Sequence, residues 1–153
     1  MIPSYLKQRT LLDERARLEA QPAVLEGYKL SFVIGPKGGP CAAVVRPDES
    51  NEGVHGILYK LPLARWPMLL ASEGVPLGYL VAEVPVKTYS DAGSPSKIVK
   101  ARTLVDSSLS ARRVEEGKPS ERYKLLLQKG AREQGIAQKY QDEVLARIET
   151  FSW

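Results

Sequence analysis

Hydrophobic and polar residues alternate along several stretches of the chain, and a period of two is typical of half-buried β-strands. Residues 41–45 are a short run of small apolar residues and residues 79–88 are rich in Val, and both stretches also fit strands. Clusters of Gly, Pro, Ser and Asp separate these stretches and predict turns. The five predicted strands cover residues 28–34, 41–45, 54–61, 79–88 and 98–105.

Apolar positions three and four residues apart, a spacing typical of helices, occur elsewhere in the chain. Ser120 is a candidate N-cap, and Gly135 is a candidate for the left-handed residue that follows a helix. The first predicted helix covers residues 3–19 and is ended by Gln21-Pro22. A second begins near Trp66, and a third lies between Ser120 and Gly135. The last helix has the apolar stripe Ile136, Tyr140, Val144 and Ile148.

The order of these elements predicts the fold class. Five strands precede most of the helix, with one helix inserted between the third and fourth strands. This order favours an α+β domain with a mostly antiparallel, barrel-like sheet. The 153 residues have the size of a single domain, and 43% apolar with 26% charged residues is an ordinary globular composition. We expect residues 1–153 to form one domain.

One helix face combines apolar side chains with a carboxylate. Trp66, Leu69, Leu70 and Glu73 are three, four and seven residues apart, and Gly74 fits a helix stop. A carboxylate that is partly withdrawn from water at a helix end suits general acid/base work. The alternative is that Glu73 simply turns outward at the end of a surface helix, because Glu is seldom buried unless it is paired.

The counts of cysteine and histidine exclude several kinds of site. Cys41 is the only cysteine, so no internal disulfide forms, and His55 is the only histidine. A His-based catalytic triad and a His/Cys zinc site are therefore excluded, and we expect neither a metal nor another cofactor. The N-terminus lacks the apolar core of a secretory signal, and no apolar run has the length of a membrane helix. We expect a cytoplasmic protein that does not act on membranes.

The net charge of +4 and the pI of about 9.2 raise the question of whether the protein binds nucleic acid. Binding to nucleic acid needs Lys and Arg gathered on one face, whereas here they are mixed with Asp and Glu, as in residues 13–17 and 132–133. We interpret the charge as solvated surface and expect no nucleic-acid partner. A nucleic-acid binder remains the third hypothesis, and it predicts an affinity that falls steeply with salt.

Two sets of short motifs carry a family resemblance. The first set is Val54-His55-Gly56-Ile57-Leu58-Tyr59-Lys60-Leu61, Ser72-Glu73-Gly74-Val75, Gly78-Tyr79 and Glu83-Val84; the second is Pro119-Ser120-Glu121-Arg122-Tyr123-Lys124, residues 130–136 and Tyr140-Gln141. In their order and spacing the two sets resemble the γ-glutamylcyclotransferase (AIG2-like) family over roughly residues 25–150.

The resemblance implies a small mixed fold in which a barrel-like sheet is flanked by helices. It also implies cleavage of small γ-glutamyl amines into 5-oxoproline and a free amine, without a cofactor. It places Glu73 at the position of the acid/base, and it places Tyr79 and Tyr123 at positions that line the substrate pocket. For the two tyrosines, the alternative is that they are ordinary half-buried aromatic residues. Glutathione-derived conjugates, γ-glutamyl amino acids and γ-glutamyl peptides all remain open as substrates.

One motif of the family is not found. The family's glutamyl-binding loop carries a Tyr-Gly-Ser-Asn signature after its first strand, and residues 1–6 resemble the segment directly after that loop. We therefore expect a domain that is incomplete at its N-terminus. Such a loss removes anion-binding amides and leaves a sheet edge on which a second copy could pair as a homodimer. The second hypothesis is accordingly a non-catalytic binding or regulatory member of the same fold.

Overall fold

The computed structural model describes residues 19–33, 42–49, 52–73, 79–90, 95–106 and 117–151. The helix predicted over residues 3–19 lies outside this part of the chain apart from Glu19, as do the loop over residues 35–40 after the first predicted strand and most of the turn after the fourth. None of the helices in these described ranges is both long and apolar enough to cross a membrane.

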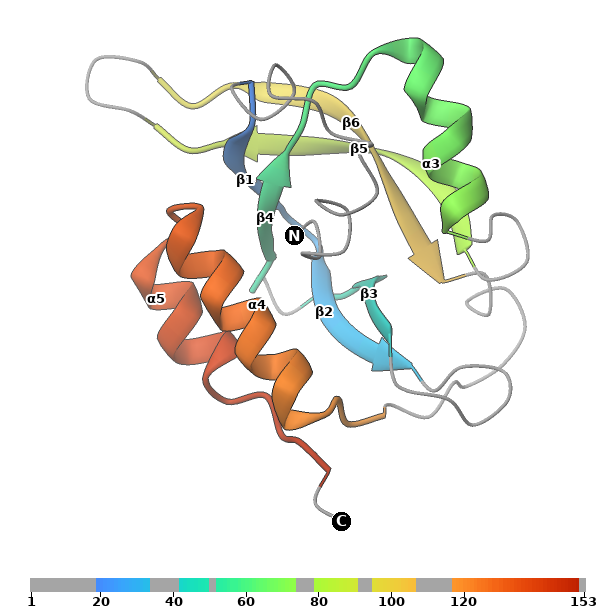
Figure 1. Ribbon diagram of the computed structural model, residues 1–153. Helices are drawn as coiled ribbons and strands as arrows, with labels where there is room; N and C mark the ends of the chain where they lie inside the picture. The colour runs from blue at the N-terminus through green and yellow to red at the C-terminus, as the bar shows by residue number, and fades with distance from the viewer. Residues whose placement is uncertain are drawn as a thin grey trace.

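A mixed sheet forms the centre of the domain (Figure 1). Its six strands are arranged in the order β2-β3-β6-β5-β1-β4, and every neighbouring pair is antiparallel except β3 and β6. The α+β class and the mostly antiparallel sheet are thus confirmed. The strands are β1 (Gln21–Leu25), β2 (Tyr28–Val33), β3 (Ala42–Pro47), β4 (Val54–Leu58), β5 (Tyr79–Thr88) and β6 (Ile98–Asp106).

The strand β1 corrects the expectation of five strands, because Gln21-Pro22 was expected to end a helix. Pro22 has no N–H for a β-ladder, which hides the strand in the sequence. In the structure, Pro22 lies beyond the residues of β1 that pair with β5, and its carbonyl accepts a hydrogen bond from the Tyr89 N–H at 3.1 Å. The missing donor therefore leaves no gap in that ladder.

The sheet curls without closing into a barrel. Gly27, with φ of +74°, turns the chain between β1 and β2, and these two strands pair with different neighbours. Such a φ is the left-handed region that favours glycine. As a result β2 and β4, at opposite ends of the strand order, come close to each other without forming a ladder.

The main core lies on the concave face of this sheet. Along β5 the side chains alternate, so that Val84 and Val86 are buried while Glu83 and Lys87 are exposed. The buried residues Val84 and Val86 pack with Ala23 and Leu25 of β1. The period of two along β5 thus directs one face of the strand into the core.

The helix α4 (Glu121–Glu133) confirms its predicted ends. The Ser120 hydroxyl accepts a hydrogen bond from the Tyr123 N–H at 3.2 Å, as an N-cap does. At the other end Gly135 has φ of +71°, and the Ile136 N–H donates to the Ala131 carbonyl at 3.0 Å. This is the Schellman arrangement that glycine allows after a helix.

The last predicted helix is only partly right. It consists of α5 (Gln138–Tyr140) and the π-helical turn η3 (Gln141–Leu145). The Ala146 N–H donates to the Gln141 carbonyl five residues earlier, at 2.8 Å, so the turn holds one residue more than an α-helical turn. Leu145 is therefore the fully buried residue, while Val144 of the predicted stripe is only partly buried.

Candidate active site

Glu73 ends the helix α3 (Trp66–Ser72), which follows a single 3₁₀ turn, η1 (Leu63–Arg65). The predicted start is confirmed, with Pro67 in the first turn, where a missing N–H costs nothing. The Glu73 N–H donates to the Leu69 carbonyl at 3.1 Å and to the Leu70 carbonyl at 3.3 Å. Two hydrogen bonds from its backbone thus fix the direction in which Glu73 leaves the helix.

The side chain of Glu73 is half-buried, as are the side chains of Trp66, Leu69 and Leu70 on the same helix. The helical spacing therefore grouped side chains that share a partly buried environment. A half-buried carboxylate keeps access to a ligand while nearby apolar groups exclude part of the water. This is the environment in which a carboxylate can exchange a proton with a bound substrate.

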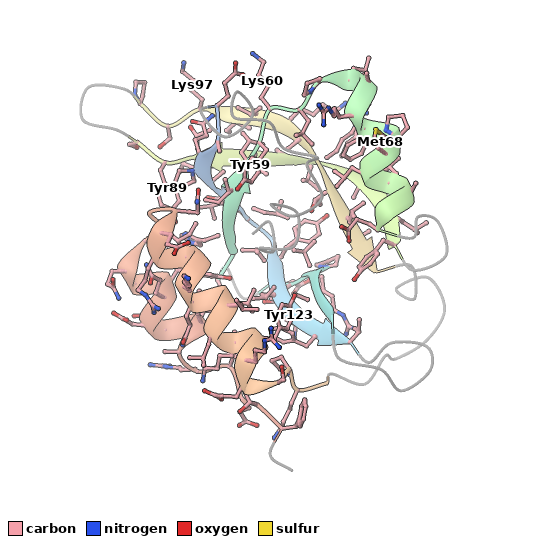
Figure 2. All side chains as sticks on the ribbon, viewed as in Figure 1. Tyr59, Lys60, Met68, Tyr89, Lys97 and Tyr123 are labelled. Atoms are coloured by element: carbon pink, nitrogen blue, oxygen red, sulfur yellow. The ribbon has the colours of Figure 1, made fainter. Side chains whose placement is uncertain are left out.

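Tyr123 lies in the first turn of α4 and points toward the strands β2 and β3 (Figure 2). Its ring meets Phe32 of β2 edge-on, with 6.1 Å between the ring centroids. Burial raises the pKa of the Tyr123 hydroxyl, a hydrogen bond from the backbone of Ala43 opposes this rise, and the charge of Glu73 adds to it. The charge of Glu73 thus reaches the Tyr123 hydroxyl, although the two residues come from different helices.

Tyr79 begins β5, on the far side of the segment that follows Glu73. Its backbone pairs with Asp106 of β6, and its side chain is half-buried. The five intervening residues, 74–78, include the predicted helix stop Gly74 and lie outside the described part of the chain. The role of Tyr79 in a substrate pocket stays a prediction.

A second polar cluster lies where β4 meets the C-terminal helices, and sequence reasoning missed it. The imidazole of His55 stacks on the ring of Tyr140, with 4.4 Å between centroids, and Nδ1 of His55 hydrogen-bonds to the hydroxyl of Tyr89. That hydroxyl also accepts a hydrogen bond from the Ala137 N–H at 3.1 Å. The periodicity placed His55 on a strand face, but its partners come from distant segments that no local pattern connects.

Acidic, histidine and cysteine side chains do not gather into a possible metal site within the described ranges: no three of them are placed to hold one ion. Glu73 and Tyr123 bring a carboxylate and a tyrosine hydroxyl to this part of the fold. These two groups move protons and donate or accept hydrogen bonds.

A curled, mostly antiparallel sheet that carries α3 on one side and α4 on another defines the class of this protein as a small α+β domain. The profile of the AIG2-like family matches residues 53–144, more than half of the chain. The chain belongs to the AIG2-like family. The matched span contains Glu73, Tyr79 and Tyr123. None of the curated protein sequences matches the chain.

Solved structures show the same fold. The chain is similar to an uncharacterized human protein, loc79017, with 26% identity and a TM-score of 0.70, and to a gamma-glutamyl cyclotransferase, with 26% identity and a TM-score of 0.72. Each alignment covers 94% of this chain and 85% of the other. YkqA from Bacillus subtilis shares the fold, with 20% identity and a TM-score of 0.71. That alignment covers 97% of this chain and 52% of YkqA.

Proposed function

We propose that this protein is a γ-glutamylcyclotransferase-type enzyme. It converts γ-glutamyl amino acids, γ-glutamyl peptides or glutathione-derived conjugates into 5-oxoproline and a free amine. Membership of the AIG2-like family and the likeness to a gamma-glutamyl cyclotransferase support this class of reaction. The observation that carries the proposal is the half-buried carboxylate of Glu73 at the end of α3, within electrostatic range of Tyr123.

Glu73 acts as the general base and then as the general acid. Its carboxylate accepts a proton from the substrate's α-amino group while the nitrogen attacks the γ-carbonyl carbon. A new C–N bond closes the five-membered ring, and the C–N bond to the leaving amine breaks. The protonated Glu73 returns the proton to the departing nitrogen, so the side chain ends as it began.

Both reacting groups belong to one substrate molecule, so the protein mainly has to hold the folded-back conformer. In this proposal Tyr79 and Tyr123 line the site that holds it. The raised pKa of Tyr123 keeps its hydroxyl protonated, so this hydroxyl is a hydrogen-bond donor throughout the neutral range. It would donate to a substrate oxygen on which negative charge is present or develops. The reaction requires no cofactor.

The test is the release of 5-oxoproline from γ-glutamyl-alanine and from glutathione by the purified chain. Glu73→Gln keeps the size and shape of the side chain but removes its ability to accept a proton. We expect product from the parent chain and its loss in this variant. Glu143→Gln, at an exposed position of η3, is the matched control and should keep the parent's activity.

The second candidate function is a non-catalytic binding member of the same fold. A folded chain that binds γ-glutamyl-alanine in calorimetry but releases no 5-oxoproline would support this second function. Product that is formed equally by the parent and by Glu73→Gln would contradict the role of Glu73.

A further inference from the structure

A chain of three side chains connects the helix that ends at Glu73 to the outer face of the sheet. The guanidinium carbon of Arg102, on β6, lies 5.5 Å from the ring centroid of Trp66, the first residue of α3. On its other side, Nε of Arg102 lies 3.5 Å from Oε1 of Glu83 on β5. Figure 1 shows α3 alongside these two strands.

The strand register explains why Glu83 and Arg102 meet. The two residues are direct partners in the antiparallel ladder of β5 and β6, so their side chains stand next to each other on the same face. Lys100 approaches the second oxygen of the same carboxylate, with Nζ 2.6 Å from Oε2. One carboxylate therefore orients two cations. Of these two cations, Arg102 is the one that also contacts α3, through Trp66.

The anchoring of α3 matters because the helix is short. Seven residues are too few to form a stable helix without tertiary contacts. Trp66 and Glu73 lie at its two ends, about 10 Å apart at 1.5 Å per residue. A change in tilt at Trp66 is therefore carried along the helix to the carboxylate at the other end.

We propose that Arg102 is a positioning residue for Glu73. Oriented by Glu83 and stacked on Trp66, its guanidinium holds α3 so that the carboxylate meets the substrate's amino group at hydrogen-bonding distance. This inference rests on the proposed function of Glu73. A planar guanidinium can stack on the indole and bond to a carboxylate at once, which a lysine ammonium does less well.

The experiment compares two variants that each remove one cation from Glu83. Arg102→Met removes the contact to Trp66, whereas Lys100→Met leaves that contact in place and is the matched control. Amide hydrogen exchange of Leu70–Glu73, followed by NMR, reports how firmly α3 is held. Steady-state kinetics with γ-glutamyl-alanine report the position of the carboxylate.

We expect exchange in this segment to become about two- to fivefold faster in Arg102→Met, the range of an exposed cation–π contact. We expect kcat to fall about tenfold while KM stays within about twofold, since a 1 Å misplacement of a reacting group can cost as much as a hundredfold. Lys100→Met should change neither quantity. Arg102→Lys, which keeps a cation above the indole, should recover part of both.

Equal effects of Arg102→Met and Lys100→Met would overturn the proposal, because they would trace the effect to the charge on Glu83 rather than to α3. Unchanged exchange in Arg102→Met, or a raised KM with an unchanged kcat, would overturn it as well. If the parent chain releases no 5-oxoproline, the proposed function fails separately. The exchange rates then decide by themselves whether Arg102 holds the helix.

Discussion

Nδ1 of the His55 imidazole shares a hydrogen bond with the hydroxyl of Tyr89, whose oxygen also accepts the Ala137 N–H at 3.1 Å. In the neutral tautomer that carries its hydrogen on Nε2, the imidazole accepts this hydrogen bond from Tyr89. This relay joins β4, the end of β5 and the start of α5, so the sheet and the C-terminal helices share one polar contact.

Stability should fall as the pH falls below about 6.5. Burial lowers the pKa of the His55 imidazole from its ordinary value of 6.5, so the folded chain binds this proton less readily than the unfolded chain does. The stabilisation is fully present above pH 6.5 and is lost as the pH falls through the lowered pKa. For one proton the slope is at most about 1.4 kcal/mol per pH unit, and partial exposure of the ring reduces it.

The measurement is the free energy of urea unfolding between pH 7.5 and pH 5.5, for the parent and for His55→Phe. The variant keeps an aromatic ring against Tyr140 but cannot titrate. The parent should lose more stability than the variant across this window. Parallel pH profiles for the two proteins would show that His55 is not the group responsible.

The two tyrosines around His55 should respond differently to the loss of their hydroxyls. Tyr89→Phe leaves both the Ala137 N–H and the imidazole without a partner, and we expect a loss of about 1–2 kcal/mol. The Tyr140 hydroxyl is buried with no hydrogen bond of normal geometry, although the backbone of His55 lies near it. Tyr140→Phe should therefore be neutral or stabilising by up to about 1 kcal/mol. Urea unfolding of the pair tests this, and equal losses in both variants would contradict it.

Local patterns predicted the elements whose residues depend mainly on their own neighbours. The alternation over residues 28–34 predicted β2, and Ser120 and Gly135 marked the two ends of α4. These features succeed because a cap, a left-handed glycine or a period of two is a property of a few adjacent residues. The strand β1 was missed because Pro22 removes the local signal, and the strand is formed by its partners β4 and β5.

The candidate site was predictable only in part. Residue spacing placed Glu73 on a partly apolar helix face, and the family resemblance added Tyr79 and Tyr123, whose roles remain predictions. The proximity of Tyr123 to Glu73 arises from the packing of α4 against β2 and β3, which no local pattern contains. The stacking of Arg102 on Trp66 likewise depends on the β5–β6 register and on the place of α3 beside it.

The π-helical turn predicts an unequal cost for two adjacent core residues. Leu145 is fully buried, so Leu145→Ala should cost about 2–5 kcal/mol through lost packing and a new cavity. Val144 is partly buried, and Val144→Ala should cost clearly less. An uninterrupted α-helix with the stripe 136, 140, 144 and 148 would favour Val144 as the more costly position. The midpoints of urea unfolding for the two variants separate the two registers.

Tyr123→Phe tests the proposed pocket without disturbing its packing. The phenylalanine ring keeps the edge-on contact with Phe32, but the backbone of Ala43 loses the hydroxyl to which it hydrogen-bonds, so stability should fall by about 1 kcal/mol. Loss of a donor to a substrate oxygen should lower kcat/KM for γ-glutamyl-alanine about tenfold, as expected for a hydrogen bond to a charged group. Tyr89→Phe, assayed where it is still folded, is the control and should keep the parent's kcat/KM. An unchanged kcat/KM in Tyr123→Phe would place its hydroxyl outside the substrate contacts and make the ring a packing residue.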